Sequence, residues 1–216
     1  SQLVAWVLDP KPGQRVVDLC AGPGGKSTHL AELLTARGHR PEDPPVTSVE
    51  LHAHKAKLIE ESARRLGLGA VIRTVVADAR QAVAVVGKGY DRVLVDAPCS
   101  GTGVLRRRPD LRWQRRPEEL SALVQLQREL LRAAAEIVAP GGVLVYSTCS
   151  LEDEENQEIV EWFLETFPGF EPSPVEPFLP EPARRALAAS GPAISIFPHE
   201  HGTDGFFIFR TVRRSD

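Results

Sequence analysis

The chain of 216 residues contains no methionine, only three cysteines, and no apolar run long enough to cross a membrane. The cysteines Cys20, Cys99 and Cys149 are odd in number and far apart, which argues against a disulfide framework and against zinc spacing. With no run of about 18 apolar residues and no signal peptide, the sequence predicts a cytoplasmic protein that binds neither a membrane nor a metal. Because Ser1 opens a helical pattern (SQLVAWVLD) without a methionine, we expect an N-terminal flank to be missing.

An excess of charge of either sign is also lacking. Lys and Arg number 26, Asp and Glu number 29, and the net charge is -3. Hydrophobic residues make up 42% and charged residues 25%, which excludes a polybasic or disordered protein. A single domain of this length buries a sizeable core, and its balanced total charge still permits a local basic patch for nucleic acid.

Apolar, β-branched runs alternate with helical patterns along most of the chain. The expected strands are 15–19, 46–49, 71–76, 92–95 and 142–147, and the expected helices are 27–36, 53–66, 118–138 and 152–167. The last helix is predicted to begin at a capping box of Ser150 and Asp153. The strands lack two-residue alternation, as strands buried on both faces of a parallel sheet do. The pattern predicts an α/β fold with a doubly wound, mostly parallel sheet, in one domain over residues 1–216.

The C-terminal part departs from this alternation. Eight of the 18 prolines lie between Pro168 and Pro198, which indicates an irregular excursion over about 168–192 with a short helix near 183–189. After it, the segments 193–197 and 206–212 flank the loop PHEHGTDG. We expect them to form a terminal antiparallel hairpin.

A glycine-rich loop, DLCAGPGGKS, follows the first expected strand and opens the first expected helix. Ligands of open α/β sheets bind at such loops, where glycines allow close approach and the helix N-terminus offers free amides. A Walker A loop would need glycine at the position of Cys20, and a dinucleotide fingerprint would need glycine at the position of Ser27. Both phosphate-binding interpretations therefore fail by one residue.

Carboxylates follow the next three expected strands, namely Glu50, Asp78 and Asp96. Glu50 stands at the distance downstream at which an acid holds a ribose diol. Three carboxylates, with Lys26 as the one phosphate-binding cation nearby, favour a ribose-bearing cofactor that is cationic and free of phosphate. S-adenosylmethionine has this character.

Two cysteines stand at the ends of two expected strands, Cys99 in DAPCSGTG and Cys149 in YSTCS. Because these strands are expected to be neighbours, both thiols should reach the crevice of the glycine loop. A nucleophilic thiol needs a lowered pKa. The helix expected after Cys149 would lower it and the acids at 152–155 would raise it, so the sequence leaves this balance open. Cys20 is expected to pack as a small buried hydrophobe.

Three motifs, DLCAGPGGKS, DAPCSGTGVLRRRPDLRW and YSTCSLEDEEN, together resemble those of the Sun-type RNA (cytosine-C5) methyltransferases, nearest to the bacterial 16S ribosomal RNA branch. The likeness extends from SQLVAWVLD to HGTDGFF, and its specific part is the pair Pro98-Cys99 and Thr148-Cys149. The chain departs from the usual CAAPGGKT at Gly22 and Ser27, and Glu50 stands where aspartate is common.

The resemblance implies a Rossmann-like class I methyltransferase that moves a methyl group from S-adenosylmethionine to C5 of a cytosine in RNA, with ribosomal RNA expected. It implies that Cys149 is the nucleophile that adds to C6, that Cys99 assists release, and that Asp96 contacts the base or the cofactor. The cofactor-binding residues that it implies are Cys20, Ala21, Gly22, Pro23, Gly24, Gly25, Lys26, Glu50, Asp78 and Asp96.

A basic segment follows the Cys99 loop, with Trp113 and Asp110 among its arginines Arg106, Arg107, Arg108, Arg112, Arg115 and Arg116. Beside an RNA chemistry site, this segment predicts phosphate contacts, and Trp113 predicts a stacking platform. His199 and His201 lack further ligands and are expected to be loop residues. We expect a monomer.

Three other classes of protein remain open. A DNA cytosine methyltransferase would use Cys99 as its nucleophile, and the second thiol argues against it. A P-loop nucleotide-binding protein is opposed by Cys20. A noncatalytic RNA-binding module would need neither thiol.

Overall fold

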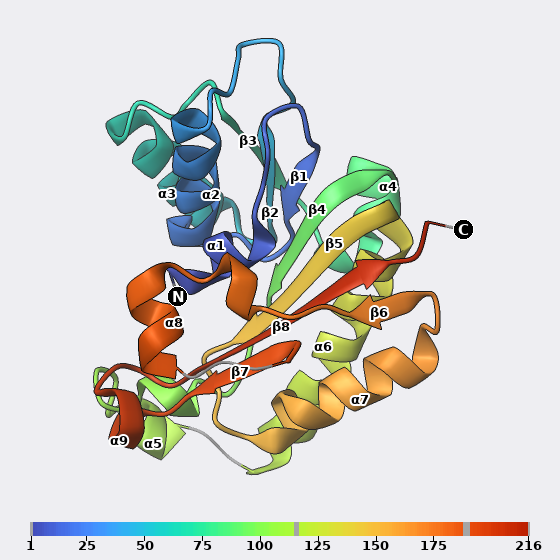
Figure 1. Ribbon diagram of the computed structural model, residues 1–216. Coiled ribbons are helices and arrows are strands. Elements are labelled where there is room, and N and C mark those ends of the chain that lie inside the picture. Colours follow the sequence, from blue (N-terminus) through green and yellow to red (C-terminus); the bar gives the residue numbers. More distant parts are fainter. Residues whose placement is uncertain (1, 115–116, 188–190, 216) are drawn as a thin grey trace.

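The buried apolar runs form the centre of one sheet in the computed structural model, which describes residues 2–114, 117–187 and 191–215 (Figure 1). Five strands run parallel: β1 (Val16–Asp18), β2 (Val46–Glu50), β3 (Ile72–Val76), β4 (Tyr90–Asp96) and β5 (Val138–Thr148). Three more complete the sheet: β6 (Phe170–Pro172), β7 (Ala193–Ile196) and β8 (Phe206–Arg213). The order is β3-β2-β1-β4-β5-β8-β6, and β7 also pairs with β8.

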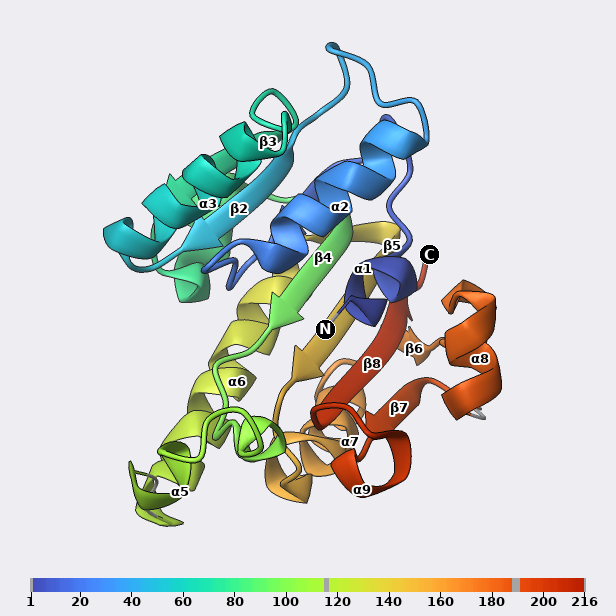
Figure 2. The ribbon, with the colours of Figure 1, turned by 90° about the vertical axis from the view of Figure 1, so that its left-hand side faces the viewer.

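Helices cover both faces of the sheet (Figures 1 and 2). One face packs against α1 (Leu3–Leu8), α2 (Gly25–Ala36) and α3 (Ala53–Arg65), and the other against α4 (Ala82–Val86), α6 (Pro117–Ile137) and α7 (Gln157–Thr166). Successive residues of β4 serve opposite faces, because Leu94 joins the core of the first face and Val93 that of the second. Each fully buried leucine or valine contributes about 1.5–3 kcal/mol, so the interior strands have little freedom of register.

Short helices occupy the connections. They are η1 (Ala79–Gln81), η2 (Thr102–Val104), α5 (Leu111–Gln114), η3 (Asp153–Glu155), η4 (Glu176–Phe178), α8 (Glu181–Leu187) and α9 (Pro198–His201). No helix among the described residues combines the length and the apolar character that a membrane crossing requires.

The doubly wound sheet and the terminal antiparallel hairpin are confirmed, since β7 and β8 pair from Ala193 with Phe209 to Ile196 with Phe206. The short helix of the proline-rich excursion lies at Glu181–Leu187, and the excursion also contains β6, which the sequence did not predict. Strand β8 is antiparallel to β5, whereas β4 and β5 are parallel neighbours as expected.

The prediction of one helix over 152–167 is wrong at its start. The segment forms the single turn η3, breaks at Asn156 (φ −119°, ψ −92°), and only then enters α7. The Ser150 hydroxyl accepts the backbone N–H of Glu152 at 3.0 Å, so it caps a turn rather than a helix. The break follows from side chains that turn inward: Asn156 accepts a 2.6 Å hydrogen bond from Thr148, and Glu155 is completely buried.

Candidate active site

The functional side chains gather where the carboxyl ends of β1, β2, β4 and β5 meet. A cavity of about 590 Å³ lies there, lined by Cys20, Gly22, Glu50, Asp78 and Asp96 among the expected cofactor residues, and by both Cys99 and Cys149. A smaller hollow of about 210 Å³ shares three of these residues and adds Asp18, Ala21, Pro23, Gly25 and Lys26. The structure therefore brings the glycine loop, the strand-end acids and both thiols together.

The glycine loop holds Glu50 in place. The Gly22 N–H donates to one Glu50 carboxylate oxygen at 3.0 Å, and the His52 N–H donates to the other at 2.9 Å. A Cβ at Gly22 would lie 2.3 Å from the same Glu50 oxygen, so only glycine permits this approach. Gly24, at φ +110°, is the N-cap residue of α2, and a Cβ there would lie 3.1 Å from the Cα of Ile59. Glu50 is thus a rigid acceptor at the cavity wall.

Asp18, at the end of β1, is a site residue that the sequence reasoning did not assign. Its carboxylate is buried, and one oxygen accepts a 2.7 Å hydrogen bond from Ser27. The other oxygen, Oδ1, has no hydrogen-bond partner within the described residues. Burial raises the Asp18 pKa to about 6, and the negative charge of Asp96 adds to the rise. The signal in the sequence was an acid inside the apolar run RVVDL.

Lys26 and Asp96 form an ion pair at 2.5 Å between the loop and the end of β4. The Ser147 hydroxyl donates to the second Asp96 oxygen at 2.8 Å, which fixes the carboxylate plane. The Lys26 ammonium also lies 5.3 Å from the centre of the Phe206 ring. Lys26 is therefore a cation close to the thiols, and its ion pair with Asp96 fixes its position.

The two thiols meet across the ends of β4 and β5, with 3.4 Å between the sulfur atoms of Cys99 and Cys149. This contact lowers the pKa of Cys149, since the Cys99 S–H donates to it, and Lys26 lowers it further against the opposing effects of burial and Asp96. The same contact, together with burial, raises the pKa of Cys99. Of the two, Cys149 is the group that ionises first, through Cys99 and Lys26 rather than through the helix and the acids at 152–155 that the sequence set against each other.

Cys20 behaves differently from the other two cysteines. Burial raises its pKa well above the ordinary thiol value, and the nearby Asp18, Asp96, Glu50 and Asp78 raise it further. It therefore stays a neutral thiol in the cavity wall, in line with the expected packing role.

A second cavity, of about 830 Å³, reaches Cys149 on the side of α8 and α9. Lys26, Arg107, His201 and Phe206 are among its lining residues. Cys149 lines both this cavity and the cavity of about 590 Å³. The ionising thiol thus stands at the boundary between two spaces.

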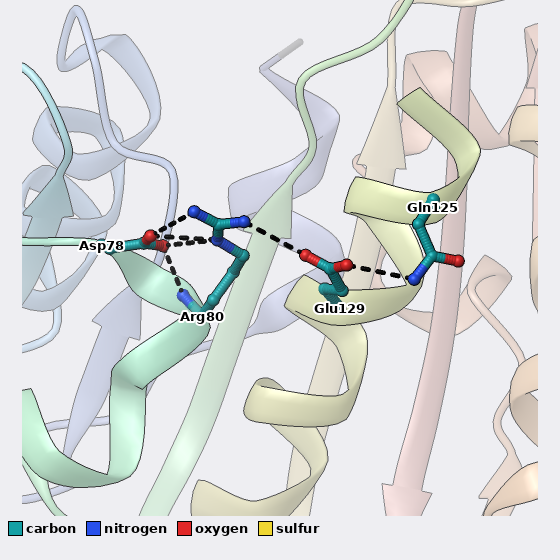
Figure 3. A network of polar contacts seen from close by, with 4 residues as sticks. All are labelled: Asp78, Arg80, Gln125 and Glu129. Atoms are coloured by element: carbon teal, nitrogen blue, oxygen red, sulfur yellow. Dashed lines mark hydrogen bonds and ion pairs between the residues drawn. The ribbon is translucent and has the colours of Figure 1, made fainter. Parts of the chain in front are cut away.

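The Asp78 carboxylate at the cavity wall is bound by the side chain of Arg80 (Figure 3). It accepts hydrogen bonds from Arg80 Nη2 at 2.6 Å and Nε at 2.9 Å, which lower its pKa. Arg80 Nη1 extends the network to Glu129 on α6 at 3.2 Å, and Glu129 accepts from Gln125 at 3.0 Å. The network joins the turn after β3 to α6 beside the cavity of about 590 Å³.

The basic segment is partly engaged with the protein itself. Arg106 donates to the Gly202 carbonyl at 3.1 Å, Arg107 pairs with Asp204, and Arg108 lies 3.6 Å from Asp110. Trp113 is 85% exposed. The side chain of Arg112, and Arg115 and Arg116 entirely, fall outside the described residues.

His201 contacts the Phe197 backbone through Nδ1. Within the described part of the chain, no group of three or more His, Cys, Asp or Glu residues is placed to hold a metal ion.

Comparison with known proteins gives a consistent result. The model of the family "16S rRNA methyltransferase RsmB/F" matches residues 5–211. A Bacillus subtilis protein named "Probable ribosomal RNA small subunit methyltransferase B" is 46% identical over 210 residues, which cover 96% of this chain and 45% of that protein. A Synechocystis protein of the same name is 38% identical over 209 residues, again 96% of this chain and 45% of the relative.

A solved structure, NSun6 from Pyrococcus horikoshii with SFG, is 32% identical with a TM-score of 0.83. The match covers 100% of this chain and 51% of that one, and it confirms the Rossmann-like methyltransferase fold. The chain spans less than half the length of these two curated relatives.

Proposed function

The chain belongs to the 16S rRNA methyltransferase RsmB/F family, and on that premise we propose that it methylates C5 of a cytosine in ribosomal RNA. The methyl donor is S-adenosylmethionine, and the reaction passes through a covalent bond between Cys149 and C6 of the base. The observation that carries this proposal is the 3.4 Å pair of thiols, whose lower-pKa member, Cys149, lines two cavities at once.

The residues of the cavity of about 590 Å³ and of the adjoining hollow fit S-adenosylmethionine. The buried Asp18 Oδ1, which lacks a partner among the described residues, suits the ammonium of the methionine end. The fixed Glu50 carboxylate suits the ribose diol, and Leu51, Leu126 and Leu130 offer an apolar surface to the adenine. When bound, the cofactor supplies a methyl group on a cationic sulfur.

The target base suits the cavity of about 830 Å³, on the other side of Cys149. The Phe206 ring offers a stacking surface, and Lys26 offers a hydrogen-bond donor to a base oxygen or nitrogen. The Arg106–Arg108 segment lies on the same side, since Arg107 also lines this cavity and Arg106 contacts Gly202. RNA binding at this segment would compete with the Asp204 contact of Arg107.

Cys149 acts first, because its lowered pKa makes it the better thiolate at neutral pH. The thiolate adds to C6 of the cytosine, which makes C5 electron-rich enough to take the methyl group. The C5 proton then leaves to a base, and the C6–S bond breaks to return the thiolate. Cys99, at 3.4 Å, assists this release. Fixed loops at two strand ends suit the task, because orientation alone is worth roughly 7–11 kcal/mol.

Substitution of each thiol tests the proposal. Cys99→Ala and Cys149→Ala variants are incubated with S-adenosylmethionine and RNA, and protein–RNA adducts are separated on a denaturing gel. We expect the adduct to accumulate with Cys99→Ala and to be absent with Cys149→Ala. Cys20→Ala removes the third thiol of the same cavity, and at saturating S-adenosylmethionine the adduct should not accumulate with it.

The reverse pattern would show that Cys99 is the nucleophile, as in the DNA-methylating alternative. DNA in a parallel reaction tests the polymer, and bisulfite mapping of the RNA tests C5 of cytosine as the position. Absence of methylation by the unmodified protein, on RNA to which it binds, would favour a noncatalytic RNA-binding module.

A further inference from the structure

A buried carboxylate, Glu155, lies between the two loops that carry the thiols. Its side chain is completely buried, and it lines neither the cavity of about 590 Å³ nor the cavity of about 830 Å³. It belongs to η3, just after Cys149 in the chain, yet its contacts are with the loop of Cys99. The proposed chemistry leaves this group without a role.

Glu155 holds the chain on both sides of Cys99. On the C-terminal side, Ser100 donates its backbone N–H to Glu155 at 2.9 Å and its hydroxyl at 2.5 Å. On the N-terminal side, the Gln127 amide donates both to Glu155 at 2.8 Å and to the Pro98 carbonyl at 2.9 Å. Glu155 and Gln127 therefore hold the residues on either side of Cys99 by hydrogen bonds.

The same network reaches the residue after Cys149. The Ser100 and Ser150 hydroxyls lie 3.0 Å apart, and because Ser100 donates to Glu155, Ser150 is the donor in this contact. In addition, the Gly103 N–H donates a 2.9 Å backbone hydrogen bond to the Cys149 carbonyl. A continuous chain of hydrogen bonds thus links the backbone next to one thiol to the backbone next to the other.

Packing alone does not account for a carboxylate here. Among the described residues, no Lys, Arg or His forms an ion pair with Glu155, so its burial is offset by hydrogen bonds only. A buried carboxylate without a cation is unfavourable unless donors surround it, and an apolar side chain would fill the space without needing them. The carboxylate fixes the relative positions of two segments, because donors from the Cys99 loop and from α6 converge on its two oxygens.

We propose that Glu155 is a positioning residue that sets the distance between the Cys99 and Cys149 sulfur atoms and thereby the rate at which the RNA adduct is released. The first part concerns geometry alone, and the second rests on the proposed function. Glu155 acts through Ser100 and Gln127 and touches neither RNA nor cofactor.

Glu155→Gln is the informative substitution, because it keeps the size of the side chain. At the Oε1 position, its new NH2 group would face the NH2 group of Gln127, and two donors repel each other. Gln127 Oε1 has no partner among the described residues, so Gln127 can rotate to accept from the new amide, but it then loses the Pro98 carbonyl. At the Oε2 position, the NH2 group would face the Ser100 hydroxyl, which must stop donating to it, and the Ser100 N–H and Gln127 keep only a neutral acceptor. The Cys99 loop therefore loses an anchor in the first arrangement and the charged acceptor of its anchors in the second. Glu154→Gln is the matched control, since Glu154 is exposed on the same turn.

The first experiment measures sulfur proximity without RNA. In a Cys20→Ala background, diamide oxidises Cys99 and Cys149 to a disulfide and is itself reduced by taking up their two protons and two electrons. The free thiols that remain are counted over time. We expect Glu155→Gln to slow disulfide formation about tenfold or more, since displacements near 1 Å change such rates by up to roughly 100-fold. Glu154→Gln should match the Cys20→Ala parent. Equal rates in both variants would overturn the proposal.

The second experiment measures release of the RNA adduct. For Glu155→Gln, in the otherwise unmodified protein, we expect the adduct to persist roughly tenfold longer while the dissociation constant for S-adenosylmethionine is unchanged. A loss of cofactor binding together with activity would indicate a general structural defect and overturn the positioning role. If neither the unmodified protein nor Cys99→Ala forms an adduct, the proposed function fails, and the diamide comparison still decides the geometric part.

Ser100→Ala covers the case in which Glu155→Gln does not fold. It removes the 2.5 Å hydroxyl contact with Glu155 and the 3.0 Å contact with the Ser150 hydroxyl, and it retains the backbone N–H bond. We expect a slower disulfide reaction than in the parent, by a few-fold, because one of the donors is lost. An unchanged rate in a folded Ser100→Ala protein counts against the proposal.

Discussion

Asp18→Asn should make the cofactor-free protein more stable at neutral pH and at the same time weaken cofactor binding. Asp18 is buried, its Oδ1 lacks a partner among the described residues, and its pKa is raised from 3.8 to about 6. A carboxyl group with a raised folded-state pKa holds its proton more tightly in the folded protein than in the unfolded chain. Stability therefore falls as the pH rises from about 4 to about 6 and stays lower above that range.

The magnitude follows from the pKa values. At about 1.4 kcal/mol for each tenfold change in ionisation constant, ionising Asp18 in the folded state costs about 3 kcal/mol at pH 7. At pH 4.5 roughly 1 kcal/mol of this cost is already present, because the unfolded chain is then largely ionised. The difference in unfolding free energy between variant and parent should therefore grow by about 2 kcal/mol from pH 4.5 to pH 7.5.

Urea unfolding followed by tryptophan fluorescence at both pH values measures this growth. Other carboxyl groups titrate alike in the two proteins, so their contributions cancel in the difference. With a slope near 2 kcal/mol/M, the relative shift of the urea midpoint is about 1 M. If the unfolding free energies of variant and parent differ by the same amount at both pH values, the raised pKa of Asp18 is refuted.

Cofactor binding should move in the opposite direction from stability. The Asp18 carboxylate is proposed to hold the ammonium of S-adenosylmethionine, a contact worth roughly 1.5–3 kcal/mol. Asp18→Asn should therefore raise the dissociation constant about 10- to 100-fold in calorimetric titration. An unchanged constant would remove Asp18 from the cofactor site, whatever the stability result.

Two further predictions concern the glycine loop and the thiols. Gly22→Ala should weaken S-adenosylmethionine binding tenfold or more, since its Cβ would displace Glu50, whereas Gly69→Ala, with nothing within 4 Å and away from the cavities proposed for the cofactor, should bind normally in the same titration. Cys99→Ala should raise the Cys149 pKa towards the ordinary thiol value because it removes the S–H donor. The pH midpoint of Cys149 alkylation in a Cys20→Ala background measures this shift, and an unmoved midpoint would contradict it.

Local pattern was enough to predict most of the sheet. The strands β1 to β4 lie within two residues of the predicted runs, because interior parallel strands must be apolar on both faces. Pairing of β4 with β5 then brings Asp96 opposite Ser147 and the two cysteine loops to one edge. The short strand β6 escaped prediction because its pairing with β8 lies within a proline-rich segment that carries no strand pattern.

The helix expected over 152–167 shows where local pattern fails. Its Ser150 and Asp153 spacing is a helix-start signal, but Glu155 and Asn156 turn inward to partners in the loop after β4 and at the end of β5. The contact of Glu155 with Ser100 joins residues 55 positions apart, and no short window of sequence contains it. Arg107 is a similar case, since its partner Asp204 lies 97 residues away.

The sequence alone determined which chemical groups this protein has at which strand ends: a glycine loop, three acids and two cysteines. It also determined the family, through motifs that are each only about ten to twenty residues long. Only the tertiary structure decided how those groups behave. The 3.4 Å contact and the nearby Lys26 make Cys149 the more acidic thiol, and burial together with the charge of Asp96 raises the pKa of Asp18. The reason is physical: a pKa depends on distances and solvent access, which arise only when distant segments pack together.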